Sequence, residues 1–122
     1  MFDGLGHSIS GLSVSGSVTD GGLFGYTDTT SIIRNVGISG GTASGSSSSG
    51  GLVGVNKGKV YNAYSAATVN GNNGVSGGLV GINTATGTIY NAYATGSVSS
   101  DGSSTGGLVG SNAGTIYNTF AT

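Results

Sequence analysis

The chain repeats itself, because the pentapeptide GGLFG or GGLVG occurs four times at nearly constant spacing. These glycine words are Gly21–Gly25, Gly50–Gly54, Gly77–Gly81 and Gly106–Gly110, spaced by 29, 27 and 29 residues. A second word with one asparagine follows each glycine word, and the four asparagines are Asn35, Asn62, Asn91 and Asn118. A fixed period of this length is typical of a stacked array, in which each repeat buries its apolar face against its neighbours.

The words within each repeat predict strands rather than helices. They are short runs rich in Val, Ile, Thr and Tyr, separated by Gly, Ser and Asn. No window has the apolar spacing of an amphipathic helix, and the chain contains no glutamate. We expect an all-β fold, a β-solenoid (β-helix) of about four to five stacked coils with roughly 28 residues and two or three strands per coil. The candidate strands of one coil are Leu52–Asn56, Val60–Ser65 and Thr68–Asn70.

The glycine words divide this single repeat domain into units. Residues 1–20 form a partial first coil or cap, residues 21–49, 50–76 and 77–105 form full coils, and residues 106–122 form an incomplete last coil. The stretch His7–Val14 is the weaker first copy of the asparagine word.

Composition excludes several classes of partner. The chain has 27 glycines among 122 residues, no cysteine or proline, and a net charge of −1. The three basic residues, Arg34, Lys57 and Lys59, are too few to build a phosphate-binding groove, so we expect no nucleic acid partner. No apolar run is long enough for membrane insertion. We also expect no cofactor.

The glycine word itself has two interpretations. It lacks the lysine and the following helix that a phosphate-binding loop needs, so a structural role is favoured. We expect its paired glycines to adopt positive φ and its last glycine to let opposite walls approach. The leucines within the words are predicted to stack in one interior column, and they are Leu23, Leu52, Leu79 and Leu108.

The asparagines predict hydrogen-bonded ladders. Stacked asparagines can bond to one another and to turn backbone. One ladder is expected at Asn35, Asn62, Asn91 and Asn118, and a second set is Asn56, Asn83 and Asn112. Metal or sugar binding is the alternative, although asparagine without nearby carboxylates is a poor metal ligand, and we expect no metal site.

Two aromatic residues, three positions apart, follow in each later unit, and positions three apart have opposite parity on a straight strand. We expect Tyr61, Tyr90 and Tyr117 to face solvent, because Arg34 and Ser10 align with them in the earlier units. The other set, Tyr64, Tyr93 and Phe120, suits an interior or half-covered place. The exposed tyrosines are the candidate ligand-binding residues, and mutual stabilisation is the alternative role.

No set of residues predicts catalysis. The only histidine, His7, reads as a turn or cap residue before the first strand. The four aspartates, at positions 3, 20, 28 and 101, fall in different units outside the regular strands. A catalytic site needs a base, an acid and orienting groups that converge, so we expect no catalytic residues and no enzyme activity.

The words GGLVGxN and TIYNAYATGSV resemble the GLUG motif of large bacterial surface proteins. Such proteins include filamentous-haemagglutinin-like adhesins and the stalks of IgA-cleaving metallopeptidases. The opening FDGLGHSISGL resembles the segment that leads into these repeats in the adhesins. The resemblance implies an extracellular location on a bacterial cell surface and a stalk or adhesive role without catalysis.

We therefore expect a structural or adhesive solenoid segment of a cell-surface or secreted protein. Its open ends would pair with the rest of a longer rod or with copies of the chain, end to end as a fibre. A module that binds host glycan or protein through the tyrosine column is the alternative. An ice-binding solenoid is the remote alternative, since threonine does not form a regular array.

Overall fold

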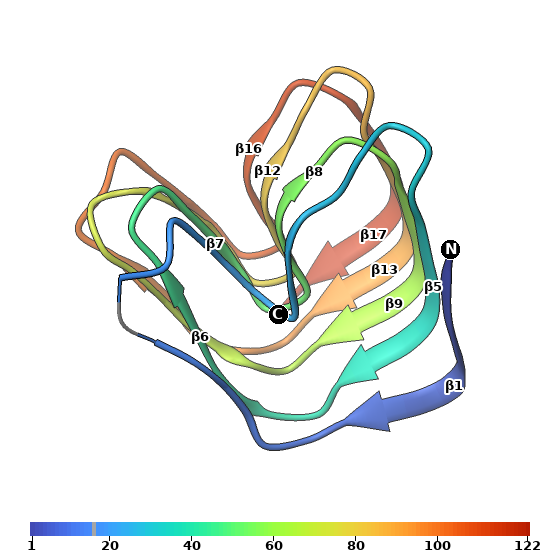
Figure 1. Cartoon of the computed structure of the whole chain (residues 1–122), viewed down its shortest axis with the longest axis horizontal. Coiled ribbons are helices and arrows are strands. Elements are labelled where there is room, and N and C mark those ends of the chain that lie inside the picture. The colour runs from blue at the N-terminus through green and yellow to red at the C-terminus, as the bar shows by residue number, and fades with distance from the viewer. Residues whose placement is uncertain (16) are drawn as a thin grey trace.

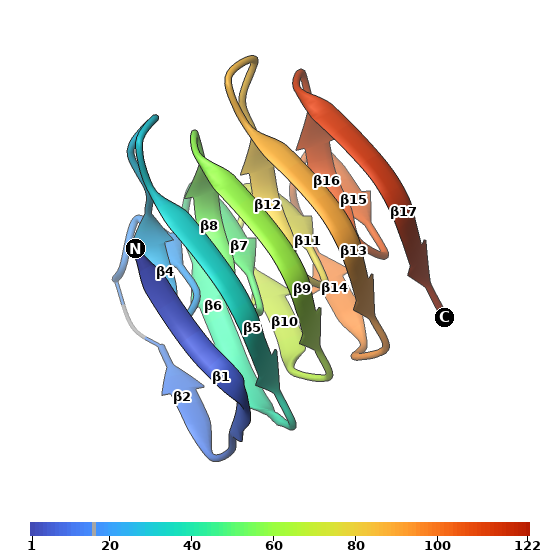
Figure 2. The ribbon, with the colours of Figure 1, turned by 90° about the vertical axis from the view of Figure 1, so that its right-hand side faces the viewer.

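A computed structural model describes residues 1–15 and 17–122, and its strands wind into coils stacked along one axis (Figure 1). The two termini lie at opposite ends of the stack (Figure 2). Each strand pairs in parallel with the equivalent strand of the next coil, so Val60 lies between Ile33 and Ile89. The predicted all-β solenoid of about four coils is confirmed, and each coil satisfies the backbone groups of its neighbours.

Four parallel sheets form the walls of the solenoid. The first sheet contains the long strands β1 (Phe2–Ile9), β5 (Ile32–Ile38), β9 (Lys59–Ser65), β13 (Thr88–Ala94) and β17 (Thr115–Ala121). The second contains β2 (Leu12–Val14), β6 (Gly41–Gly45), β10 (Thr68–Gly71) and β14 (Val98–Ser100). The third contains β3 (Asp20–Gly21), β7 (Ser48–Gly50), β11 (Val75–Gly77) and β15 (Ser104–Gly106). The fourth contains β4 (Phe24–Tyr26), β8 (Val53–Asn56), β12 (Val80–Asn83) and β16 (Val109–Asn112).

Each full coil therefore has four strands, and the expectation of two or three was wrong. The strands of the third sheet are three-residue or shorter segments that consist mostly of Gly, Ser and Asp, and only Val75 and Thr105 favour strands by propensity. They become strands because parallel partners above and below supply the hydrogen bonds.

The predicted unit boundaries begin at the glycine words, whereas a closed coil can be counted from any corner. Those boundaries stay a prediction, and Gly16 of the first unit lies outside the described residues.

The core is a narrow column of aliphatic side chains between the sheets. Ile33, Val60 and Ile89 stack in the long-strand sheet and are at most 3% exposed. Leu52 and Leu79 are fully buried and precede β8 and β12, at bends, while Leu23 and Leu108 are partly buried against the same core. Because the leucine lies at a bend, the valine after it is also buried, although the two would have opposite parity on a straight strand.

The glycine words need glycine at their first position because the neighbouring backbone leaves no room for a Cβ atom. A Cβ added to Gly50 or Gly77 would overlap the carbonyl oxygen of Val53 or Val80, because the chain turns sharply between the third and fourth sheets. The expectation of positive φ in the paired glycines was wrong for the last three words, in which no glycine has positive φ.

The long strands bend at a left-handed asparagine. Asn35, Asn62, Asn91 and Asn118 have φ between 49° and 54°. Asparagine tolerates this conformation better than most residues. In β9 the residues Val60 and Ala63 both face the core, so Asn62 resets the alternation of the strand. This reset determines which side chains reach the outer face.

Candidate functional site: the outer face of the long strands

Two parallel stacks of aromatic rings run along the outer face of the long strands. In the first stack, Tyr61 and Tyr90 have ring centroids 4.7 Å apart and Tyr90 and Tyr117 are 4.9 Å apart, with interplanar angles of 9° and 1°. Tyr61 and Tyr90 are half-buried, and Tyr117 is 47% exposed. Each interior ring face is covered by the next ring, so the rings offer solvent mainly their edges and hydroxyl groups.

The second stack contains Tyr64, Tyr93 and Phe120. Its centroids are 5.1 and 5.0 Å apart, and its rings are within 6° of parallel. Tyr64 and Tyr93 are half-buried and Phe120 is 56% exposed. An interior position for this set is therefore excluded, since the left-handed asparagine places both stacks on the outer face and each ring is half-covered by its neighbours.

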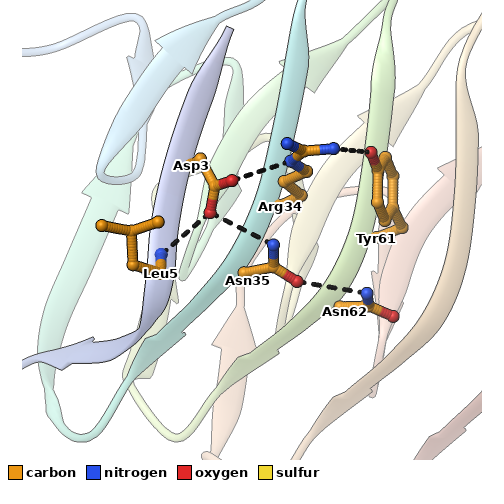
Figure 3. Close-up of polar contacts among 6 residues, drawn as sticks. All are labelled: Asp3, Leu5, Arg34, Asn35, Tyr61 and Asn62. Atoms are coloured by element: carbon orange, nitrogen blue, oxygen red, sulfur yellow. Dashed lines mark hydrogen bonds and ion pairs between the residues drawn. The ribbon is translucent and has the colours of Figure 1, made fainter.

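An asparagine ladder separates the two stacks. Asn118 Nδ2 donates to Asn91 Oδ1 at 3.3 Å, Asn91 donates to Asn62 at 3.3 Å, and Asn62 donates to Asn35 at 3.1 Å. Asn35 Nδ2 then donates to Asp3 Oδ1 at 3.1 Å (Figure 3). A carboxylate only accepts hydrogen bonds, so Asp3 orients every amide in the ladder in one direction.

Asp3 and Arg34 cap this face at its N-terminal end (Figure 3). Arg34 Nε donates to Asp3 Oδ2 at 3.0 Å, and Arg34 Nη1 donates to the Tyr61 hydroxyl at 3.0 Å. The backbone N–H of Leu5, the Asn35 amide and Arg34 together hold the pKa of Asp3 below its ordinary value. Burial of the Tyr90 ring between its two neighbours raises the pKa of its phenol.

The first copy of the asparagine word is therefore β1 itself, and the prediction that it is His7–Val14 was wrong. Asp3 lies opposite Arg34 in the position assigned to Ser10. His7 lies within β1, opposite Val36, and not before the first strand. The register shifts between Asp3 and His7, where Leu5 and Gly6 have positive φ. Because β1 has this bulge where the other long strands have an asparagine, its sequence does not show that it is a copy of the asparagine word.

A second asparagine ladder lies inside the solenoid. Thr27 Oγ1 donates to Asn56 Oδ1 at 2.9 Å, Asn56 Nδ2 to Asn83 at 2.9 Å, and Asn83 Nδ2 to Asn112 at 2.8 Å. Asn56 and Asn83 are fully buried. Asn56 also accepts from Gly58 N and donates to Gly58 O, which closes the turn into the next long strand. Both asparagine ladders have structural hydrogen-bond partners along their length.

Three of the four aspartates are held by structural partners, each in a separate place. Asp3 lies in β1 and Asp20 in β3, so the expectation that both fall outside strands was wrong. Asp20 accepts from the Ser48 hydroxyl, and Asp28 accepts from Thr29 N. Among residues 1–15 and 17–122, no three acidic, histidine or cysteine side chains gather as metal ligands would.

Comparison with known proteins links this repeat to one motif family. Residues 72–99, about one coil, match the family described as "Glug: The GLUG motif". The predicted resemblance to GLUG repeats is therefore confirmed at this coil. The chain is also 39% identical over 80 residues to halomucin of Haloquadratum walsbyi (strain DSM 16790 / HBSQ001). That alignment covers 65% of this chain and about 1% of halomucin.

No solved structure matches the chain. In the part of the chain that the structure describes, no helix has the length and apolar character needed to cross a membrane. The fold and the motif together describe a β-solenoid repeat module.

Proposed function

We propose that this chain is a non-catalytic structural and adhesive segment of a cell-surface or secreted protein. The coil that matches the GLUG motif and the similarity to a small part of a very long protein support a segment of a longer rod. The in-register stacking of rings, amides and aliphatic side chains in consecutive coils supports a spacer role, since each added coil repeats the same contacts.

The observation that carries the rod hypothesis is the in-register pairing of β9, β13 and β17, which repeats the same contacts from coil to coil. Among the described residues β17 pairs only with β13, and Asn118 Oδ1 has no donor. Tyr117 and Phe120 are exposed at this edge. Another coil of the same kind, from the rest of a longer protein, would continue the outer asparagine ladder and both aromatic stacks. The opposite edge, at β1, carries a bulge and the charged Asp3, two devices that blunt a sheet edge.

Stacking of copies is tested by the mass of the 122-residue chain in solution as its concentration increases. We expect the wild type to self-associate through its β17 edges and Phe120→Lys to stay a monomer, because a charge at the edge opposes pairing. Thr68→Lys adds the same charge in mid-rod, where Thr68 is exposed, and is expected to self-associate like the wild type. A wild type that stays monomeric throughout would refute stacking of copies and leave the spacer role intact.

Binding of glycan or protein by Tyr61, Tyr90 and Tyr117 is the second candidate function. The hydroxyl edges of this stack face solvent and support binding. The ring faces do not support it, because they are stacked on one another. Tyr90→Phe removes one hydroxyl and keeps the stack, so it is expected to weaken binding on a glycan array without changing the melting temperature. Unchanged binding by Tyr90→Phe would exclude this column as the contact.

Ice binding stays a remote alternative. Thr88 and Thr115 align in the long-strand sheet, but Lys59 and Ile32 continue that column. Ser13, Thr42 and Thr68 align in the second sheet. Thermal hysteresis of the purified chain tests this alternative directly.

A further inference from the structure

The second aromatic stack lacks a ring in the coil of β5. Gly37 lies directly opposite Tyr64 in the register and so occupies the position of the next ring. A Cβ added to Gly37 would overlap the Tyr64 ring, which therefore leans over the glycine. Below that ring the stack is interrupted, and Ser8 of β1 follows in the same column.

A hollow of about 350 Å³ lies at this interruption. Its lining residues include His7, Asn35, Gly37, Asn62 and Tyr64. These residues come from β1, β5 and β9, so three consecutive coils build the hollow.

The polar groups around the hollow have unused hydrogen-bonding capacity. Asn35 and Asn62 each donate one N–H along the ladder, and an amide has a second N–H to offer (Figure 3). The side chain of His7 is exposed and makes no hydrogen bond among the described residues, so its ring nitrogens are available to a ligand. No charged residue lines the hollow. The nearby Asp3 and Arg34 are paired with each other.

An aromatic face flanked by neutral donors and acceptors suits a ring that has an apolar C–H face and hydroxyl groups at its edge. A pyranose sugar has this chemistry, whereas an aromatic side chain would leave the amides and the imidazole without new partners. The absence of a lining charge favours a neutral sugar over an acidic one.

We propose that the hollow is a subsite for one neutral pyranose unit of a glycan, which stacks beneath Tyr64 and hydrogen-bonds to Asn35, Asn62 and His7. The sugar lies in the hollow beside the glycine that interrupts the stack. This subsite is distinct from the Tyr61–Tyr90–Tyr117 column and does not depend on stacking of copies, so it can fail or hold independently of the rod hypothesis.

The test is a titration of the 122-residue chain, followed by NMR, with the methyl glycosides of glucose, galactose and mannose. We expect saturable shifts at His7, Asn35, Asn62 and Tyr64 for at least one glycoside, with a Kd on the order of 1 mM. Sorbitol has the hydroxyl groups without the ring and is expected to produce no saturable shift.

Two variants locate the site. Gly37→Tyr supplies the missing ring and is expected to weaken binding at least tenfold, since the Tyr64 ring can tilt away from the added side chain. His7→Ala removes one exposed hydrogen-bonding group and is expected to weaken binding severalfold without changing the melting temperature. Because His7 is exposed, this variant keeps the test informative if Gly37→Tyr does not fold.

Three outcomes would overturn the proposal. The first is the absence of a saturable shift with all three glycosides. The second is saturable shifts at Tyr61, Tyr90 and Tyr117 that Gly37→Tyr leaves unchanged, since they would place binding on the other stack. The third is saturable binding of phenol in the hollow with no binding of the glycosides, since it would change the ligand class to an aromatic group.

Discussion

At the scale of single residues, Ser76 has the buried oxygen that lacks a hydrogen-bond partner among the described side chains. Its counterpart in the preceding coil, Ser49, donates to Gly45 O at 3.3 Å. Three residues separate β10 from β11, whereas two separate β6 from β7. The longer turn places the Gly71 carbonyl one residue further along the chain from Ser76, and the hydroxyl is left unpaired.

This difference predicts opposite effects for the same substitution. Ser76→Ala is expected to stabilise the fold by about 1 kcal/mol, because it removes a buried polar group that has no partner. Ser49→Ala is the matched control and is expected to destabilise it by about 1 kcal/mol, because it removes a hydrogen bond. Urea unfolding of the two variants measures both effects, and a destabilised Ser76→Ala would show that its hydroxyl is satisfied in solution.

Asp3 makes the stability of the first coil depend on pH. Its pKa is lowered in the folded chain by the Leu5 N–H, the Asn35 amide and Arg34, so it contributes stability above the ordinary Asp pKa. We expect that contribution to be lost as the pH falls from about 4 through the lowered pKa. Melting temperatures of the wild type and Asp3→Asn, measured from neutral to acidic pH, are expected to converge at the acidic end. A constant difference would contradict the role of the Asp3 charge.

At the scale of elements, the two asparagine ladders differ in burial. The inner ladder passes through the fully buried Asn56 and Asn83, whereas Asn62 and Asn91 of the outer ladder are exposed. The inner amides have lost their contact with water and depend on one another. The outer amides keep water as an alternative partner, and their residues also supply the left-handed conformation that bends each long strand.

Asn83→Ala is therefore expected to cost about 3 kcal/mol, since it leaves buried ladder groups without partners. Asn91→Ala is expected to cost about 1 to 2 kcal/mol, mainly because alanine is disfavoured at φ of 49°. Asn91→Gly keeps the left-handed conformation accessible and is expected to cost less than Asn91→Ala. Denaturant unfolding ranks the three variants, and an equal cost at both ladders would contradict the argument from burial.

At the scale of the whole molecule, stability is expected to follow the number of coils. Consecutive coils pair in register, and Val60 and Ile89 occupy equivalent positions 29 residues apart. Deleting residues 60–88 therefore joins Lys59 to Ile89 and removes one coil without changing the register. We expect a folded, shorter chain with a lower melting temperature, because one interface between coils is lost.

Circular dichroism and small-angle scattering measure the fold and the length of this deletion variant. A duplication of residues 60–88 is the matched control and is expected to lengthen the rod and raise the melting temperature. Complete unfolding of the deletion variant, with the duplication also unstable, would show that the coils are not modular.

The repeat by itself determined the solenoid and the positions that stack. In a parallel, in-register array the same position of each repeat lies next to its counterpart, so a column in the aligned sequence becomes a column in space. For that reason Leu52 and Leu79, and the successive asparagines, could be placed together from the sequence.

The tertiary structure alone decided which face the second aromatic stack occupies, how many strands a coil has and where the outer ladder ends. The face of the second aromatic stack depends on a left-handed φ at the asparagine, which resets the alternation of side chains that a regular strand would have. The number of strands in a coil depends on pairing between coils, because segments such as Ser48–Gly50 have little strand propensity of their own. The end of the outer ladder depends on Asp3, whose place in the register is hidden by the bulge that precedes His7.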